Sequence, residues 1–118
     1  MKILFLEDHS FYAEEIIDFL RNTLKFQVDY ADSWEDAESY MISGNTYDIS
    51  LLDVILNNGK TGVLFAEKWE EKLGRILFIT GCVDDMTIDT VNKWSAVSKM
   101  GIIWPKLNSF IKGGICKI

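Results

Sequence analysis

The residues with the clearest chemical potential are acids placed directly after predicted strands. Glu7 and Asp8 follow the apolar run 2–6, and Asp53 follows the run 49–52. Both runs are short and mostly apolar, which is typical of strands covered on both faces by helices. Three carboxylates brought together repel one another unless a cation neutralises them, and Mg²⁺ suits a site with few, hard oxygen ligands. The pattern therefore predicts a divalent metal site.

Two further side chains could act with these acids on a phosphoryl group. Thr80 comes directly after the predicted strand 76–79, and Lys106 follows the predicted strand 102–104. Beside a bound metal, an aspartate carboxylate can attack phosphorus, while an ammonium and a hydroxyl stabilise the phosphoryl oxygens. We therefore predict that Asp53, Lys106 and Thr80 form the catalytic group.

The elements that must position these residues alternate along the chain. Apolar runs predict strands, and three- and four-residue apolar spacing or a capping residue predicts helices. The predicted strands are 2–6, 26–30, 49–52, 76–79 and 102–104; the predicted helices are 11–24, one capped by Ser33, 62–73, and one from Asp84 or Asp85 to about Lys99. The tail 108–118 is expected to be weakly helical at best, because Gly113 and Gly114 interrupt it. This alternation predicts a doubly wound parallel α/β sheet, which binds ligands outside the carboxyl ends of its strands.

Composition narrows the class of protein. A length of 118 residues with 48% hydrophobic residues predicts one compact domain, 1–118. The net charge of −6 argues against direct nucleic-acid binding. The apolar run at the N-terminus is too short for a signal segment or a membrane span, so we expect no membrane partner and a cytoplasmic location. Cys82 and Cys116 lack metal-ligand spacing and are expected to be thiols.

Four short segments occur in a distinctive order on the predicted strands: Leu6-Glu7-Asp8-His9, the stretch from Tyr47 to Asp53, Ile79-Thr80-Gly81, and Trp104-Pro105-Lys106. In this order they resemble the receiver domain of response regulators, over essentially the whole chain. The resemblance implies a flavodoxin-like five-stranded sheet of order 2-1-3-4-5 with helices on both faces. We expect the last helix to be short or irregular.

The resemblance implies that Asp53 is phosphorylated from a phosphohistidine on a sensor histidine kinase or a histidine phosphotransfer protein. It implies Mg²⁺ as the cofactor. Asp8 and Asp53 would bind the ion, Glu7 would lie nearby or act through water, and the backbone carbonyl of Ile55 would complete the protein ligands. His9 is assigned no catalytic role.

The remaining site residues would handle the phosphoryl group. Lys106 would pair with it, Thr80 would move toward it to report phosphorylation to a downstream protein target, and Gly81 would leave the access path open. With no output domain in the sequence, the signal is expected to pass by protein contact, unless the chain is part of a longer one. Ile55 and Cys82 offer no carboxylate or amide to position attacking water, so we expect slow self-dephosphorylation.

Three features depart from the receiver pattern. Leu107 follows Lys106, where the family usually has a proline. Ile103 stands three residues before Lys106, where the family usually has an aromatic partner for the switch threonine. Gly113 and Gly114 fall in the family's last helix. These departures leave open a phosphorylation-independent interaction module, a pseudo-receiver, as the alternative function.

A third function class is a phosphohydrolase that works through an aspartyl-phosphate. That chemistry often uses a second acid two residues after the nucleophile, and here Ile55 occupies the position. We therefore expect the chain to catalyse its own phosphorylation and slow dephosphorylation, without multiple turnovers on a separate substrate.

Overall fold

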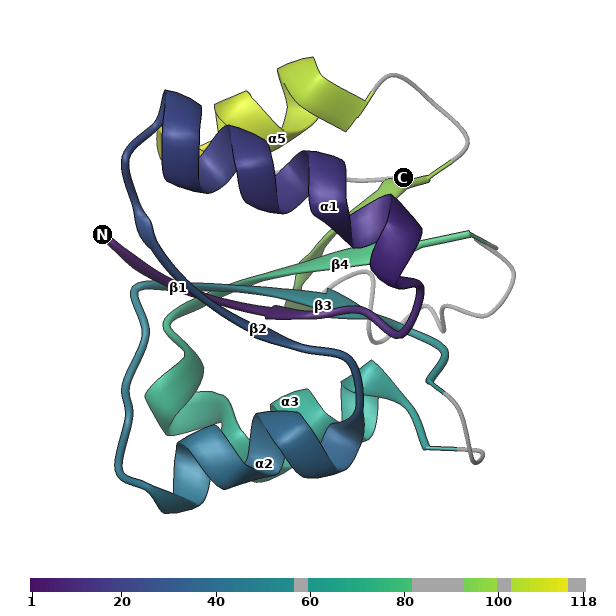
Figure 1. The fold of residues 1–118 in the computed structure, drawn as a ribbon. Coiled ribbons are helices and arrows are strands. Elements are labelled where there is room, and N and C mark those ends of the chain that lie inside the picture. The colour runs from purple at the N-terminus through teal and green to yellow at the C-terminus, as the bar shows by residue number, and fades with distance from the viewer. Residues whose placement is uncertain (57–59, 82–92, 100–102, 115–118) are drawn as a thin grey trace.

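A five-stranded, all-parallel sheet forms the centre of the molecule, in the order β2-β1-β3-β4-β5 (Figure 1). In the computed structural model, the residues described are 1–56, 60–81, 93–99 and 103–114. The strands are β1 (Lys2–Leu6), β2 (Gln27–Ala31), β3 (Ile49–Asp53), β4 (Arg75–Thr80) and β5 (Ser95–Ser98). The predicted doubly wound architecture and strand order are confirmed.

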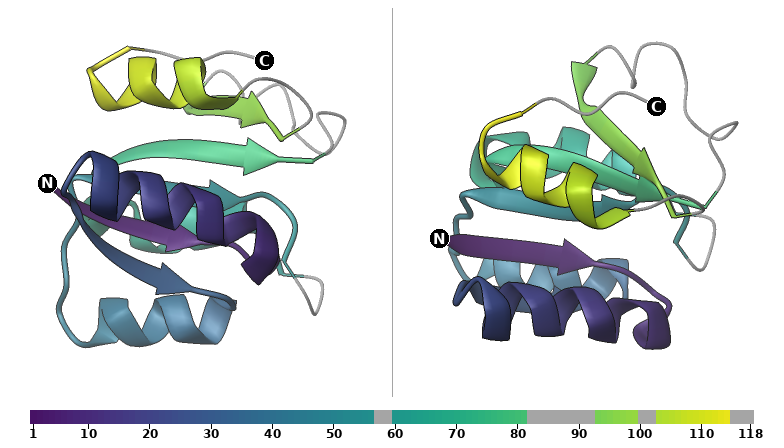
Figure 2. Two further views of the ribbon diagram at one scale, coloured as in Figure 1. Left: turned by 45° about the horizontal axis from the view of Figure 1, so that its top comes forward. Right: turned by 90° about the horizontal axis from the view of Figure 1, so that it is seen from above.

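Helices cover both faces of this sheet (Figure 1). On one face lie α1 (Ser10–Asp18), which continues into the π-helical turn η1 (Phe19–Thr23), and α5 (Ile103–Ile111). On the other lie α2 (Trp34–Ile42) and α3 (Gly62–Leu73). Figure 2 shows α5 over the β4–β5 half of the sheet and α1 over the β1 half. The rings of Phe19 and Trp104, 5.2 Å apart between centroids, join the two helical segments on the first face.

Alternation along the strands builds two apolar cores, one on each side of the sheet. In β1, Ile3 and Phe5 pack toward α1 and α5, while Leu4 and Leu6 pack toward α2 and α3. All four side chains are fully buried. A strand buried on both faces needs apolar residues at every position, which explains the continuous apolar run at the start of the chain.

Capping residues fix the N-termini of α2 and α3, the two helices on the second face of the sheet. The Ser33 hydroxyl accepts a hydrogen bond from the Asp36 amide at 3.1 Å, and the Thr61 hydroxyl accepts one from the Leu64 amide at 3.2 Å. These bonds satisfy amides that the first turn of a helix leaves unpaired. Gly74 ends α3 with φ of 65°, a conformation that glycine adopts without steric cost.

The prediction was wrong for the position of the fifth strand and for the end of the helix predicted before it, residues 95–98. The fifth strand is Ser95–Ser98, where the sequence predicted the end of a helix, and the helix α5 begins at Ile103, where the sequence predicted a strand. Residues 84–92 of that predicted helix lie outside the described residues. Pro105 occupies the first turn of α5, where a missing backbone N–H costs no helical hydrogen bond.

The glycines near the C-terminus end α5 rather than interrupt it. Gly113 has φ of 106° and follows the last helical residue by two positions. Arg75, at the start of β4, donates to the carbonyl oxygens of Phe110 at 2.6 Å and Gly114 at 2.7 Å. Its guanidinium also lies 4.1 Å from the centre of the Phe110 ring. A cation thus binds the carbonyl end of the helix, where the helix dipole is negative.

Candidate functional site

The chemically active side chains gather at the carboxyl ends of the central strands. Asp8 follows β1, Asp53 ends β3, Thr80 ends β4, and Lys99 follows β5 directly. They line a pocket of about 280 Å³ together with His9, Ile55 and Gly81. The pocket lies at the edge where an open, doubly wound sheet binds its ligands.

Two buried carboxylates form the floor of the site. Glu7 is fully buried and Asp53 is 4% exposed. β1 and β3 are neighbours with Leu6 opposite Leu52, so the residues after these two positions meet at the same end of the sheet. The Glu7 backbone is held by two hydrogen bonds: its amide donates to Ala31 at 3.0 Å, and its carbonyl accepts from the Tyr30 hydroxyl at 2.6 Å.

Lys99 connects the two carboxylates. Its ammonium lies 2.8 Å from Glu7 Oε1 and 3.2 Å from Asp53 Oδ2, and its side chain is 15% exposed. The Lys99 amide donates to the Thr80 carbonyl at 2.8 Å, which extends the pairing of β4 and β5 by one residue. Because its backbone is tied to β4, Lys99 reaches across β4 to the acids of the central strands. Sequence reasoning missed this lysine because it placed residues 95–99 in a helix.

The structure brings together all the predicted site residues except Lys106. Thr80, Gly81 and Ile55 line the same pocket as Asp53. Thr80 is 1% exposed, and the Ile55 amide lies 3.4 Å from Asp53 Oδ1. Lys106 lies on α5 with an exposed side chain, outside the residues that line the pocket. Its expected position at the end of the fifth strand is wrong, because the fifth strand ends eight residues earlier, at Ser98.

Burial and charge shift the ionisation of the central groups. Burial, and then the charge of Glu7, raise the pKa of Asp53 from 3.8 to about 7, although Lys99 acts to lower it. Burial acts to lower the pKa of Lys99, but its hydrogen bonds and the charges of Glu7 and Asp53 outweigh that effect and raise it. The site therefore holds more negative charge than one ammonium balances.

The acids fit a hard divalent cation. Glu7 Oε2 and Asp8 Oδ1 are buried and make no hydrogen bond among the described residues, although the His9 imidazole lies 3.1 Å from Asp8 Oδ1. Glu7, Asp8, His9 and Asp53 each offer one ligand atom, and these atoms all lie within 4.8 Å of one another. Carboxylate oxygens without a donor in a buried site are what a Mg²⁺ or similar ion would satisfy.

Two residues to which the sequence gave no role lie against the site. The His9 ring contacts the acids, as part of the same ligand cluster. The Tyr12 ring lies 4.9 Å from the Lys99 ammonium, and its buried hydroxyl has no hydrogen-bond partner in the described part of the chain. Burial, followed by the charges of Glu7 and Asp53, raises the pKa of Tyr12 to about 12. Tyr12 lies three residues after His9, one helical turn along α1, a spacing that could have signalled a shared face.

Gly62 fixes the backbone beneath Asp53. Its amide donates to the Val54 carbonyl at 2.9 Å, and a Cβ at this position would overlap the Asp53 carbonyl oxygen. The start of α3 therefore packs directly on the end of β3. This close approach requires glycine.

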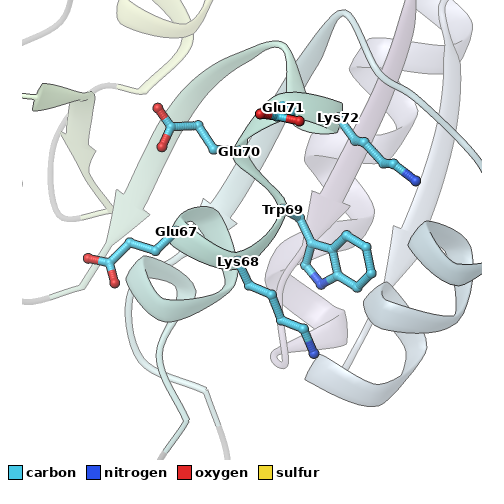
Figure 3. A pocket seen from close by; sticks show the side chains of 6 residues that line it. All are labelled: Glu67, Lys68, Trp69, Glu70, Glu71 and Lys72. Carbon is cyan, nitrogen blue, oxygen red and sulfur yellow. The ribbon is translucent and has the colours of Figure 1, made fainter.

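A larger hollow, of about 760 Å³, lies away from this site along α3 and is lined by residues 67–72 (Figure 3). In Figure 3, Glu67 and Glu70 point to one side of the helix, while Trp69 and Lys72 point to the other. On the Trp69 side, the Lys68 and Lys72 ammonium groups lie 5.3 and 5.8 Å from the centre of the Trp69 ring, and Lys68 and Trp69 both donate to Glu38 Oε2. These contacts join α3 to α2, whereas the groups that could act on a phosphoryl group lie at the strand ends. The smaller pocket at the strand ends is therefore the candidate functional site.

Comparison with solved structures identifies the fold. A CheY-like response regulator receiver domain from Methylobacillus flagellatus matches 92% of this chain and 97% of its own length, with 26% identity and a TM-score of 0.75. The N-terminal domain of a response regulator/sensory box/GGDEF protein from Carboxydothermus hydrogenoformans matches 95% of this chain and 91% of its own, with 25% identity and a TM-score of 0.78. The chain is thus similar to response-regulator receiver domains over nearly its whole length.

A more distant similarity is to a response regulator from Burkholderia pseudomallei solved with a phosphorylated aspartic acid, a calcium ion and citrate. It shares 18% identity and a TM-score of 0.72 over 90% of this chain and 64% of its own. No family model matches the sequence, and no curated protein matches it. Among the described residues, no helix is both long and apolar enough to cross a bilayer.

Proposed function

We propose that this chain, with its response-regulator receiver fold, is a two-component signalling receiver that accepts a phosphoryl group on Asp53. The donor would be a phosphohistidine on a sensor histidine kinase or a histidine phosphotransfer protein. A divalent ion such as Mg²⁺ would supply positive charge that neutralises the attacking carboxylate and the phosphoryl oxygens. Glu7, Asp8, Asp53 and the backbone carbonyl of Ile55 are the groups that would hold it. The whole of 1–118 forms the receiver domain in this proposal.

Lys99 takes the role that sequence reasoning gave to Lys106. Its ammonium already contacts Asp53 Oδ2, so it lies where it could bind an oxygen of a phosphoryl group attached to that carboxylate. An Asp53 carboxylate oxygen would form the new bond to phosphorus as the P–N bond breaks and the imidazole of the donor leaves. The transferred group would then place its negative charge beside Lys99. Thr80 supplies a hydroxyl on the neighbouring strand, and Gly81 contributes no side chain to the entrance.

The bridge from Lys99 to Glu7 and Asp53 is the observation that carries this proposal. A mostly buried cation between two buried acids, beside two buried carboxylate oxygens that make no hydrogen bond among the described residues, is costly to assemble for stability alone. The same groups are useful in phosphoryl transfer, in which negative charge must be stabilised around phosphorus. The Burkholderia structure with its phosphorylated aspartic acid and calcium ion supports the same use of this fold.

The test is phosphorylation by acetyl phosphate in Mg²⁺, measured by intact mass. We expect one added phosphoryl group on the wild type, and none with EDTA or in Asp53→Asn. Asp48→Asn is the matched control, because Asp48 is exposed at the opposite end of β3. If the wild type gains no phosphoryl group and binds no beryllofluoride in Mg²⁺, the proposal fails.

A pseudo-receiver is the second candidate, and Ala96 favours it. In the receiver pattern, an aromatic residue stands three positions before the lysine that pairs with the phosphoryl group. If Lys99 is that lysine, the position is occupied by Ala96, which is 1% exposed. Alanine has no aromatic ring that could change its position when Thr80 moves. In this reading, the chain binds its downstream protein target whether or not Asp53 is phosphorylated.

Binding to a purified target separates the two candidates. A receiver requires the affinity to change when beryllofluoride and Mg²⁺ are added, and Asp53→Asn should abolish that change. A pseudo-receiver requires equal affinity in all these conditions.

A further inference from the structure

His9 lies directly over the acidic cluster. Its Nδ1 atom is 3.1 Å from Asp8 Oδ1 and 3.3 Å from Glu7 Oε1. The side chain is 73% exposed, so the imidazole contacts the buried acids on one side and solvent on the other. A ligand that enters the pocket from solvent would therefore meet this ring at the entrance.

The position of His9 is not explained by helix capping. His9 is the N-cap residue of α1, yet its side chain makes no capping hydrogen bond. Ser33 and Thr61, the N-caps of α2 and α3, both make one. Serine, threonine, aspartate and asparagine are the residues that normally cap a helix, so a histidine here is not selected for that purpose.

The acids beneath the ring have unused ligand atoms. Among the described residues, Glu7 Oε2 and Asp8 Oδ1 are buried oxygens without a hydrogen bond, although Asp8 Oδ1 lies 3.1 Å from His9 Nδ1, and the Asp8 side chain is 6% exposed. Two ligands on opposite sides of one ion, each bound at about 2.1 Å, lie about 4.2 Å apart. The ligand atoms of Glu7, Asp8, His9 and Asp53 all lie within 4.8 Å of one another, so a small closure would bring all four to one ion.

We propose that His9 adds an imidazole nitrogen to the carboxylate site and makes it selective for divalent first-row transition ions over Mg²⁺. Mg²⁺ prefers oxygen ligands and gains little from exchanging a water for imidazole. Co²⁺, Ni²⁺ and Zn²⁺ bind imidazole well, Mn²⁺ binds it more weakly, and affinities rise from Mn²⁺ through Co²⁺ to Ni²⁺. This inference rests on the metal site of the proposed function, but it concerns which ion that site prefers.

The test compares Mg²⁺ and Co²⁺ affinities by isothermal titration calorimetry in the wild type and in His9→Gln. Because any carboxylate site favours Co²⁺ to some extent, the measured quantity is the ratio of the two affinities. We expect His9→Gln to lower the Co²⁺:Mg²⁺ ratio at least about 10-fold, since loss of a group that only supports a metal ligand already has an effect of this size. Glu14→Gln, on an exposed side chain of the same helix, should leave the ratio unchanged. Asp53→Asn should lower the affinity for both ions, which would show that they bind in this pocket.

A spectroscopic measurement gives an independent result. Pulsed electron paramagnetic resonance of bound Mn²⁺ should show coupling to one imidazole nitrogen in the wild type and none in His9→Gln. A ratio that stays within about twofold in His9→Gln, or a Mn²⁺ spectrum without nitrogen coupling in the wild type, overturns the inference. In that case, phosphorylation of the wild type in Mg²⁺ would still support the proposed function. Failure of the wild type to bind either ion would instead overturn both this inference and the metal part of the proposed function.

Discussion

The two sides of the site differ in how firmly the fold holds them. On the central side, β1 and β3 present buried acids whose backbone is held by Tyr30 and packed against Gly62. On the edge side, Lys99 follows β5, an outermost strand of four residues. The centre of the sheet thus concentrates negative charge, while the balancing cation comes from the edge of the sheet. Any event that moves Lys99 would therefore change the charge at the centre.

Lys99→Met should have the largest effect, because it cuts the connection between the two sides. Removal of one partner from a buried ion pair leaves the others without compensation, so we expect a loss of about 3 kcal/mol in unfolding free energy at neutral pH without metal. Urea denaturation measures it, and added Mg²⁺ should recover part of the loss. Lys106→Met, on the exposed surface of α5, is the control and should change stability by less than about 0.5 kcal/mol. Equal effects for the two lysines would contradict the central role of Lys99.

Gly62→Ala should strain the central side alone. A methyl group there overlaps the Asp53 carbonyl oxygen, so β3 and the start of α3 must separate. We expect a loss of about 2 kcal/mol, the usual size of an overpacking effect, together with slower phosphorylation of Asp53. Thermal unfolding and the acetyl phosphate reaction measure the two effects. A variant as stable as the wild type would show that the packing under Asp53 is looser than described.

Asp53→Asn should stabilise the protein by relieving the excess charge of the central side. The raised pKa of Asp53, about 7, means that the folded protein keeps a proton between about pH 4 and 7 that the unfolded chain releases. Stability contributed by this group is therefore lost as the pH rises through that interval. At pH 7.5 without metal, we expect Asp53→Asn to gain about 1 kcal/mol and to show a flatter dependence of stability on pH. A steeper dependence in the variant would contradict the assigned shift.

Gly81→Ala should have the smallest effect and tests the tolerance of the edge side. Among the described residues, a Cβ at Gly81 would meet the Lys99 side chain, at 3.9 Å, an ordinary contact. We expect a change in stability below about 0.5 kcal/mol. The rate of phosphorylation by acetyl phosphate then reports whether access past Gly81 matters. A large loss of stability would show that the edge side is as tightly packed as the centre.

The same division explains which parts of the site could be predicted from the sequence. Strands in the middle of a doubly wound sheet are apolar on both faces, so β1, β3 and β4 stand out, and with them the positions of Glu7, Asp53 and Thr80. The edge strand Ser95–Ser98 contains two serines and is too short to give a clear pattern. The segment Ile102-Ile103-Trp104 is more apolar and was therefore predicted to be the strand.

The local sequence around Lys106 is similar to the expected pattern of a lysine directly after the fifth strand. A lysine after an apolar triplet and a proline looked like the end of a strand, yet Trp104, Leu107 and Ile111 have helical spacing and pack into the core on the α5 side. The local sequence is compatible with either a strand or a helix here, and packing against the core favours the helix. The role of His9 could not be predicted for a different reason: only the approach of the ring to Glu7 and Asp8 in space, and its failure to cap α1, distinguish it from a loop residue.

The hydrogen bonds from Arg75 to the end of α5 affect how the molecule unfolds. A helix of nine residues is too short to persist alone in water, and the last turn of α5 has no basic residue of its own to offset the helix dipole. Arg75 provides that charge from the first residue of β4, 35 positions earlier than Phe110. The C-terminal helix and the fourth strand should therefore open as one cooperative unit in hydrogen exchange, although they are far apart in the chain.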